Sequence, residues 1–395
     1  MLPDPRSIHR FFSGLSEVCP VARLSHVHLI HWSTEPPSPL DPLREAGFRG
    51  TVVAARASLA DAIRHHHPGL TVKLDDRPTA GEPSEHLLME LPQGREAARL
   101  AIETALAALA PEGRLWLFGE RESGIRSLAK RFSDTETALC KGHLRLHTLT
   151  PESRSLPEKG QSAPFRPEAD GFAYIKHDGL RLAVKPGIFS WRAIDAATLL
   201  LLDALREAPG ARVLDWGCGS GVLGTTLAQR FPETRVTLSD DLITATACAR
   251  RTVEINGLSD RCEVITEDGI GPLLGKQRFD AIVTNPPFHR GVRTDHDATL
   301  NFLASAAALL APGGTLWLVG NRFMDYGTLL KEHLGEAEEF DGDDSFTVWR
   351  GVKSALTPRQ KSAHTRHLTS TREDSPRNPF RNMPSGRWIG MDELS

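Results

Sequence analysis

The chain lacks the features that mark disulfide-bonded, metal-binding and membrane-spanning proteins. Only five of its 395 residues are cysteines, and they form no CxxC pair and no metal-ligand spacing, so neither a disulfide scaffold nor a metal site is predicted. No apolar run approaches the roughly 20 residues that cross a bilayer, and the opening MLPDPRSIHRFF has no apolar core of a signal peptide. A net charge of −3 excludes a strongly basic nucleic-acid coat but permits a local basic face. We therefore expect a soluble, reduced, cytoplasmic protein without membrane or metal partners.

Changes in composition divide the chain into four parts. Residues 151–170 hold four prolines and almost no aliphatic side chains, which predicts a linker that buries little apolar surface. From Ala355 onward Ser, Thr, Arg and Pro dominate, so we expect a disordered tail over residues 354–395. Both a weak electrostatic hold on RNA and no functional role remain open for this tail. Two domains are thus predicted, over residues 1–150 and 171–353.

In the second domain, apolar β-branched runs alternate with helical patterns. Strands are predicted at 212–214, 235–238, 263–265, 280–284, 315–319 and 345–349, and helices around 221–230, 241–256 and 297–310. Alternation of this kind indicates an α/β fold with a doubly wound, mainly parallel sheet. The last two strands, separated by a longer insertion, are expected to form a hairpin at the sheet edge.

Two segments of the chain resemble each other. Residues 87–119 and 281–320 both read as a strand, a Pro-containing turn, an Ala/Leu-rich helix and then LAPxGxLWLxG. The match predicts that the first half has the fold of the second by internal duplication. The first copy has no Gly-rich turn before residue 87, and Glu90-Leu91-Pro92-Gln93 replaces the polar NPPF of the second copy. We therefore expect an N-terminal domain without a cofactor site.

A glycine-rich turn is the most distinctive local feature. The segment VLDWGCGSG, residues 213–221, ends a predicted strand and opens a helix; its glycines are Gly217, Gly219 and Gly221. A dinucleotide site would want a further glycine where Val222 stands, and Asp215 would repel a pyrophosphate. That carboxylate instead suits the cationic amino-acid end of S-adenosylmethionine (SAM), and Asp240, after the next strand, can accept ribose hydroxyl protons. A plain strand–helix turn is the alternative for this motif alone.

The second polar motif is Asn285-Pro286-Pro287-Phe288, which follows an apolar strand. Its position is the carboxyl edge at which open α/β sheets bind ligands. The prolines stiffen the turn, so the Asn285 amide and the Pro286 carbonyl can accept both hydrogens of a planar –NH2 group. Phe288 can stack on the ring that carries the amine. An isolated Asn-Pro turn would be only structural, but together with the glycine turn it predicts methylation of an amino nitrogen.

Together these motifs resemble class I SAM-dependent methyltransferases. Residues 171–353 are more narrowly similar to the small-domain methyltransferases of bacterial ribosomal RNA, which act on the guanine exocyclic amine. The likeness is carried by KPGIFS at 185–190 followed by Asp195, by NPPFH at 285–289, and by VGNRFMDY at 319–326. In the first half of the chain the likeness to this family is weak outside residues 87–130. In the glycine turn, Trp216 is bulkier than the residue that is usual at this place in the family.

The resemblance implies two Rossmann-like domains, of which the C-terminal one is catalytic and binds SAM. It implies Asn285, Pro286 and Phe288 as catalytic residues acting on guanine N2. Its implied cofactor-binding residues are Asp215, Gly217, Gly219, Gly221 and Asp240, with Asp268 on the adenine amine and Phe189 and Asp195 over the cofactor. Holding the nitrogen, methyl carbon and sulfur in line lowers the barrier to transfer. No dedicated general base is expected, because the amine proton becomes acidic once the methyl is attached.

The partner is expected to be ribosomal RNA or a ribosomal subunit, with the target base outside its stack. Contacts with the RNA backbone are predicted for three residues just after the NPPF turn: His289, Arg290 and Arg293. Four cations of the first domain are candidates to extend this RNA-binding surface: Arg121, Arg126, Lys130 and Arg131. A merely solvated face is an equal alternative for them. Transfer to a protein glutamine amide, or SAM and RNA binding without chemistry in an assembly factor, are the alternative functions. The subunit, the nucleotide and the oligomeric state stay open.

Overall fold

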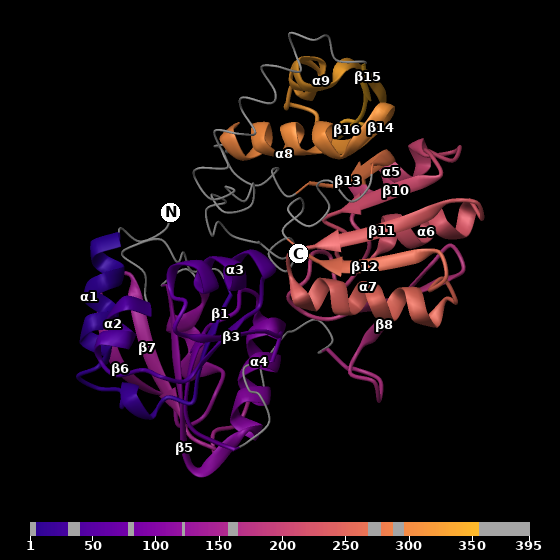
Figure 1. The fold of residues 1–395 in the computed structure, drawn as a ribbon. Helices are drawn as coiled ribbons and strands as arrows, with labels where there is room; N and C mark the ends of the chain where they lie inside the picture. Colours follow the sequence, from indigo (N-terminus) through magenta and orange to yellow (C-terminus); the bar gives the residue numbers. More distant parts are fainter. Residues whose placement is uncertain are drawn as a thin grey trace. The chain divides into compact units, whose positions relative to one another are not determined.

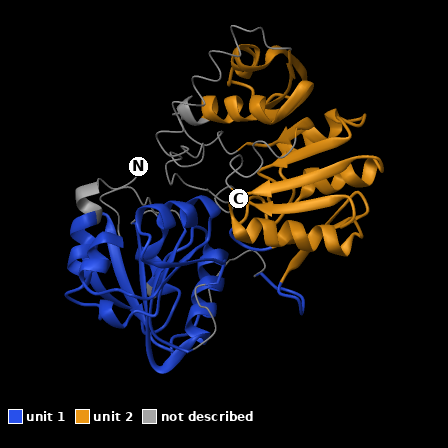
Figure 2. Cartoon of the chain, in the orientation of Figure 1, with its two compact units in different colours: residues 1–171, 185–187, 387–395 blue, residues 172–184, 188–386 orange. Residues whose placement is uncertain are grey.

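The computed structural model describes residues 5–30, 40–77, 83–120, 123–156, 165–267, 278–286 and 296–354. Their contacts divide the chain into two compact units (Figure 2), with the main boundary between Gly171 and Phe172. Residues 185–187 belong with the first unit, although they follow the start of the second. The predicted domain limits remain predictions, since the linker residues 157–164 and the tail from 355 lie outside the described residues.

The second unit is built around a seven-stranded sheet with helices on both sides (Figure 1). Its elements are β8 (Ala173–His177), β9 (Leu180–Val184), α5 (Ala196–Ala204), β10 (Arg212–Trp216), α6 (Val222–Arg230), β11 (Arg235–Asp240), α7 (Ile243–Ile255), β12 (Cys262–Thr266), β13 (Phe279–Thr284), α8 (His296–Leu309), β14 (Leu310–Asn321), α9 (Tyr326–Leu334), β15 (Gly335–Gly342) and β16 (Phe346–Lys353). The strand order is β12-β11-β10-β13-β14-β16-β15, and β8 and β9 form a separate hairpin. The first five strands run parallel, as expected for a doubly wound fold.

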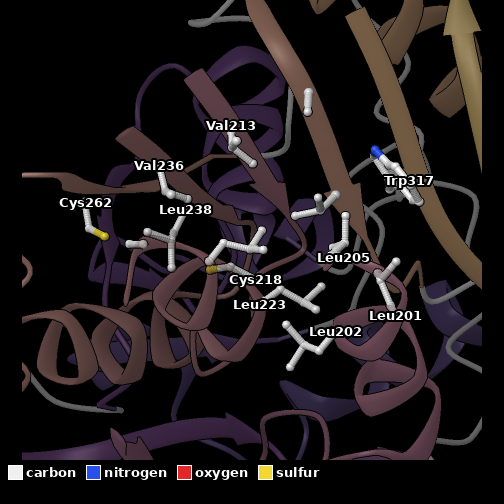
Figure 3. Packing of buried hydrophobic residues seen from close by; sticks show 14 of the residues in the cluster. Leu201, Leu202, Leu205, Val213, Cys218, Leu223, Val236, Leu238, Cys262 and Trp317 are labelled. Carbon is white, nitrogen blue, oxygen red and sulfur yellow. The ribbon is translucent and has the colours of Figure 1, made fainter. Parts of the chain in front are cut away.

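Alternate side chains of each strand enter different cores because the side-chain period of a strand is two. Val213 packs with Leu201 of α5 and Leu223 of α6, in the cluster shown in Figure 3. Its neighbour Leu214 lies on the other face, with Phe302 of α8. Trp216 also points into this second core, with its ring centroid 4.5 Å from that of Phe302. The bulky residue of the glycine turn is therefore accommodated beneath α8 rather than in the turn.

The expected pairing of the last two predicted strands is confirmed, but their expected place at the sheet edge is wrong. The predicted strands at 315–319 and 345–349 fall in β14 and β16, which pair antiparallel, but β15 pairs with the outer side of β16 and forms the edge. The insertion between them contains α9 and then β15. The sequence of β15, GEAEEFDG, has four acidic side chains and no apolar alternation, as is common at an edge that must not pair with other chains. For that reason hydrophobic periodicity did not predict it.

The first unit repeats the architecture of the second. Its elements are α1 (Pro5–Leu15), β1 (His26–Leu29), α2 (Leu40–Glu45), β2 (Thr51–Ala54), α3 (Ala57–His66), β3 (Thr71–Leu74), β4 (Ser84–Glu90), α4 (Arg95–Ala107), β5 (Leu109–Glu120), β6 (Glu136–Lys141) and β7 (Leu144–Leu149). The strand order, β3-β2-β1-β4-β5-β7-β6, is that of the second sheet position by position. The predicted duplication of the fold is thus confirmed.

Parts of the predicted linker pack against the first unit. Ser155 forms an isolated antiparallel bridge with Phe132. The side chain of Phe165 is buried, and its backbone N–H donates to Glu96 Oε2 at 3.1 Å. Aromatic burial therefore holds a segment whose composition alone indicated no order.

Candidate active site

The glycine turn joins β10 to α6 in a conformation that requires its glycines. The φ angles of Gly217, Gly219 and Gly221 are +75°, +55° and +82°, in the region that residues with a Cβ rarely occupy. The backbone N–H groups of Gly217 and Cys218 donate to the carbonyl of Ser239, at 2.8 and 2.9 Å. The turn is thereby tied to the end of β11.

Space and packing distinguish the three glycines. A Cβ atom added to Gly217 or Gly219 would meet nothing within 4 Å, whereas one added to Gly221 would lie 3.0 Å from Leu238 Cδ2. Gly221 is therefore required by the packing of α6 on the sheet. The other two glycines leave open space on the outer side of the turn, where a ligand can approach the backbone closely.

Asp215 is a fully buried carboxyl beneath this turn. Its Oδ2 accepts a hydrogen bond from the backbone N–H of Gly224 at 2.8 Å, but its Oδ1 is buried and has no hydrogen-bond partner. Burial raises the pKa of Asp215 from 3.8 to about 7, and the charge of Asp240 adds to the effect. A buried, unsatisfied acceptor of this kind is stabilised by a cationic or hydrogen-bonding ligand.

Asp240 holds the turn from the neighbouring strand. Its Oδ2 accepts from the N–H of Gly219 and its Oδ1 from the N–H of Leu242, both at 2.9 Å. These bonds tie the glycine turn and the start of α7 to the end of β11. The predicted ribose contact of Asp240 is compatible with this geometry and stays a prediction.

Asn285 lies directly after β13, and its side-chain amide is held on one side. Nδ2 donates to Asp195 Oδ2 at 3.0 Å and to Thr198 Oγ1 at 2.9 Å. Both acceptors belong to the start of α5, where Asp195 is the N-cap and accepts from the N–H of Thr198 at 3.3 Å. Asn285 is half-buried and Pro286 is buried. The Oδ1 atom of Asn285 is thus left as an acceptor on the side away from α5.

A buried hydrogen bond joins the glycine turn to the Asn-Pro motif. Thr284 Oγ1, from the last residue of β13, donates to the carbonyl oxygen of Trp216 at 2.8 Å. Because β10 and β13 are adjacent parallel strands, this bond fixes the point where each of them leaves the sheet. The structure therefore brings Asp215, the turn, Asp240 and Asn285 to one sheet edge, as the sequence predicts.

Three residues that contribute to this edge could not be predicted from sequence motifs. Thr198, Thr284 and Gly224 carry no motif of their own. For Thr198 the signal is the helix cap, an Asp three residues before it at the start of an apolar run. For Gly224 the signal is a glycine inside a helix: a Cβ there would lie 3.0 Å from Asp215 Oδ2.

Several predicted site residues cannot be placed in the same way. Asp268, Phe288, His289, Arg290 and Arg293 lie outside the described residues, as does Arg121. Phe189 lies between β9 and α5 and is partly buried, and its contact with a cofactor stays a prediction.

Among the predicted basic residues of the first unit, Arg126 and Lys130 are exposed on the 3₁₀ helix Ile125–Lys130. Arg131 donates to the carbonyl of Gly124 at 3.4 Å, which anchors it to the start of that helix. Their role toward RNA remains a prediction.

The first unit carries different residues at the equivalent edge. The strand pairings align Val27 with Asp215, since Val27 faces Val52 and Leu88 as Asp215 faces Leu238 and Val283. By the same registers, Ala54 stands for Asp240 and Glu90 for Asn285.

Glu90 is buried, and its Oε2 accepts the N–H of Ile30 at 2.6 Å. The first sheet thus has neither of the two carboxylates that flank the glycine turn. At the place of Asn285 it has Glu90, whose carboxylate is bonded to the backbone of Ile30 in the same unit.

The described residues suit a ligand that is cationic and carries a ribose. The open face of Gly217 and Gly219, the unsatisfied Asp215 oxygen and the acceptors of Asp240 match the sulfonium amino acid and the sugar of SAM. Within the described ranges no three His, Cys, Asp or Glu side chains are grouped to hold a metal ion. No helix in those ranges is both long enough and apolar enough to cross a membrane.

Known proteins share both units of this chain. Residues 179–350 match the methyltransferase small domain family, and residues 30–142 match the N-terminal domain of the same family. A ribosomal RNA small subunit methyltransferase C from Hahella chejuensis is 36% identical over 273 residues, covering 68% of this chain and 78% of its own. One from Pseudomonas aeruginosa is 36% identical over 287 residues, covering 71% and 83%.

A solved structure is similar over nearly the whole chain. It is that of the T. thermophilus N2 methyltransferase of a 16S rRNA guanine (RsmC), in complex with AdoMet and guanosine. The sequence identity is 26% and the TM-score 0.70, over 89% of this chain and 92% of that one.

Proposed function

This chain belongs to the ribosomal RNA small subunit methyltransferase C family and is a SAM-dependent methyltransferase, and we propose that it methylates the exocyclic N2 amine of a guanine in the RNA of the small ribosomal subunit. The acceptor named for the T. thermophilus relative, a guanine N2 in 16S rRNA, supports this choice. An RNA substrate of that kind also favours a cytoplasmic location.

The observation that carries the proposal is the junction between the two motifs. The 2.8 Å bond from Thr284 to the Trp216 carbonyl sets the Asn285 acceptor beside the glycine turn. An amine bound at Asn285 therefore lies close to whatever occupies the open face of Gly217 and Gly219. Fixed proximity of this kind lowers the barrier to transfer between two bound reactants.

The residues of the chain have separate tasks in this reaction. When bound, SAM supplies a methyl group on a positively charged sulfur. Asp215 and Asp240 would hold its amino-acid and ribose ends. Asn285 Oδ1 and the Pro286 carbonyl accept the two amine hydrogens, which turns the nitrogen lone pair out of conjugation with the ring and toward the methyl. Once the nitrogen has gained a methyl its extra proton is acidic and leaves to solvent, so no residue is needed as a base.

The first unit takes no part in these steps as a second catalytic centre. Val27, Ala54 and Glu90 stand where the second unit has its two carboxylates and its amide. We propose that this unit has no SAM site and contributes a surface for the RNA or the subunit.

The test is to offer purified protein labelled SAM together with separate acceptors. These are undermethylated small subunits, naked small-subunit RNA, large subunits as a control, and a release factor as a source of glutamine amides. We expect label only with small-subunit RNA or particles, at guanine N2 by mass spectrometry of the digested nucleosides. Label in the release factor alone would overturn the RNA assignment. SAM binding without transfer to any of these acceptors would point to an assembly factor.

A further inference from the structure

We propose that Asp195 and Thr198 are positioning residues that set which end of the Asn285 amide faces the substrate. This inference rests on the proposed function, since it concerns how the same amine is recognised. The Asn285 amide has two ends of similar shape but opposite hydrogen-bonding character: the NH2 end only donates and the oxygen only accepts. Only the oxygen is useful toward an amine.

The contacts of Asn285 make one orientation much more favourable than the other. Both hydrogens of its Nδ2 are used, on Asp195 Oδ2 at 3.0 Å and on Thr198 Oγ1 at 2.9 Å. A carboxylate has no hydrogen to donate. If the amide turned over, Asn285 Oδ1 would face Asp195 Oδ2 with two acceptors in contact, and a charge-assisted hydrogen bond would be lost. The acidic side chain therefore enforces an outward-facing oxygen.

The two residues are themselves held rigidly. Asp195 caps α5, and the same Oδ2 that receives Asn285 also accepts the N–H of Thr198 at 3.3 Å. Thr198 is only 7% exposed. The helix that carries them is anchored in the core through Leu201 and Leu202. A carboxylate and a hydroxyl on a packed helix orient a neighbour more precisely than groups on a loop do.

This arrangement differs from the role predicted from sequence, a cofactor contact for Asp195. Asp195 caps α5 and is the partner of Asn285, 90 residues further along the chain. These contacts assign it to the binding of the amine that receives the methyl group. The two roles make different predictions: a cofactor contact affects SAM affinity, whereas a positioning residue affects turnover and the recognition of the amine.

The experiment compares four variants of the full-length protein. Asp195→Asn keeps a helix-capping side chain but removes the charge that prevents the amide from turning. Thr198→Val removes the second acceptor at nearly constant volume, and Thr198→Ser retains it. Asp203→Asn, an exposed position on the same helix, is the matched control. For each variant we would measure kcat and KM with small subunits, the SAM dissociation constant, the melting temperature, and the affinities for guanosine and inosine.

Inosine differs from guanosine in lacking the amine, so the ratio of the two affinities reports on the amide acceptor. We expect Asp195→Asn and Thr198→Val to lower kcat by about tenfold or more, the usual effect of losing one oriented hydrogen bond. Both should narrow the preference for guanosine while SAM affinity and melting temperature change little. Thr198→Ser and the control should behave as the wild type.

Two results would overturn the inference. If the first two variants keep the wild-type kcat and the wild-type guanosine preference, the amide does not need its partners. If SAM affinity falls in step with kcat, Asp195 acts on the cofactor. A wild-type protein that does not methylate small-subunit RNA would instead refute the proposed function.

Discussion

Asp215→Asn should stabilise the ligand-free protein and weaken its binding of SAM, and the size of the first effect follows from burial. The carboxyl is fully buried, and its pKa is about 7 instead of 3.8. Between these two pH values the folded chain keeps a proton that the unfolded chain releases, so stability falls as pH rises. At about 1.4 kcal/mol per pH unit, ionising Asp215 costs the fold about 4 kcal/mol in total. An amide at this position never ionises and avoids that cost.

The assay is the difference in melting temperature between Asp215→Asn and the wild type, without ligand, at several values from pH 5 to pH 8.5. The advantage of the variant should grow with pH and level off above about pH 7. Asp178→Asn, which removes one partner of the exposed Arg230 ion pair at 3.1 Å, is the control and should show little pH-dependent difference. Calorimetric titration at pH 8 should show weaker SAM binding by Asp215→Asn.

Two results would refute this reasoning. A variant whose advantage is the same at pH 5 and pH 8 would mean that Asp215 is already ionised at pH 5 in the folded protein, so that burial does not raise its pKa. Unchanged SAM affinity would mean that the carboxylate does not face the cofactor.

Three other substitutions test separate parts of the site. Asn285→Ala should abolish turnover with small subunits while calorimetric SAM affinity changes little; equal loss of both would show a structural role. Gly221→Ala should destabilise the second unit by about 1–3 kcal/mol, because φ is +82° and Leu238 lies 3.0 Å from the new Cβ; an unchanged urea midpoint would contradict the packing. Glu90→Ala should cost about 1–3 kcal/mol by leaving the buried N–H of Ile30 unpaired, with SAM affinity unaltered; weaker SAM binding would argue for a cofactor site in the first unit.

Site positions that depend on a backbone turn, or that directly follow a strand, could be predicted from the sequence. The glycine turn and Asn285 directly follow apolar strands, and the carboxyl ends of adjacent parallel strands meet at one edge. Periodicity and turn residues are local signals, so they predict where each strand ends. The fold class then implies that the glycine turn and Asn285 lie at the same edge of the sheet. The duplicated LAPxGxLWLxG segment extended the same argument to the first unit.

Contacts between distant side chains could not be predicted in this way. Nothing local links Thr198 to Asn285, because the hydrogen bond depends on how α5 packs against the end of β13. The acidic edge strand β15 was missed for a related reason: its partner β16, and not its own composition, makes it a strand. Sequence patterns report burial well and report specific polar pairing poorly.

One position that is equivalent in the two sheets carries an apolar side chain in the first and a carboxyl group in the second. Val27 fills its place with an ordinary apolar contact, whereas Asp215 leaves an oxygen buried and unsatisfied at the corresponding place. At this one position, then, the second unit has a buried acceptor that a bound ligand can satisfy, and the first unit has none. Saturating SAM should therefore slow limited proteolysis of the second unit more than that of the first.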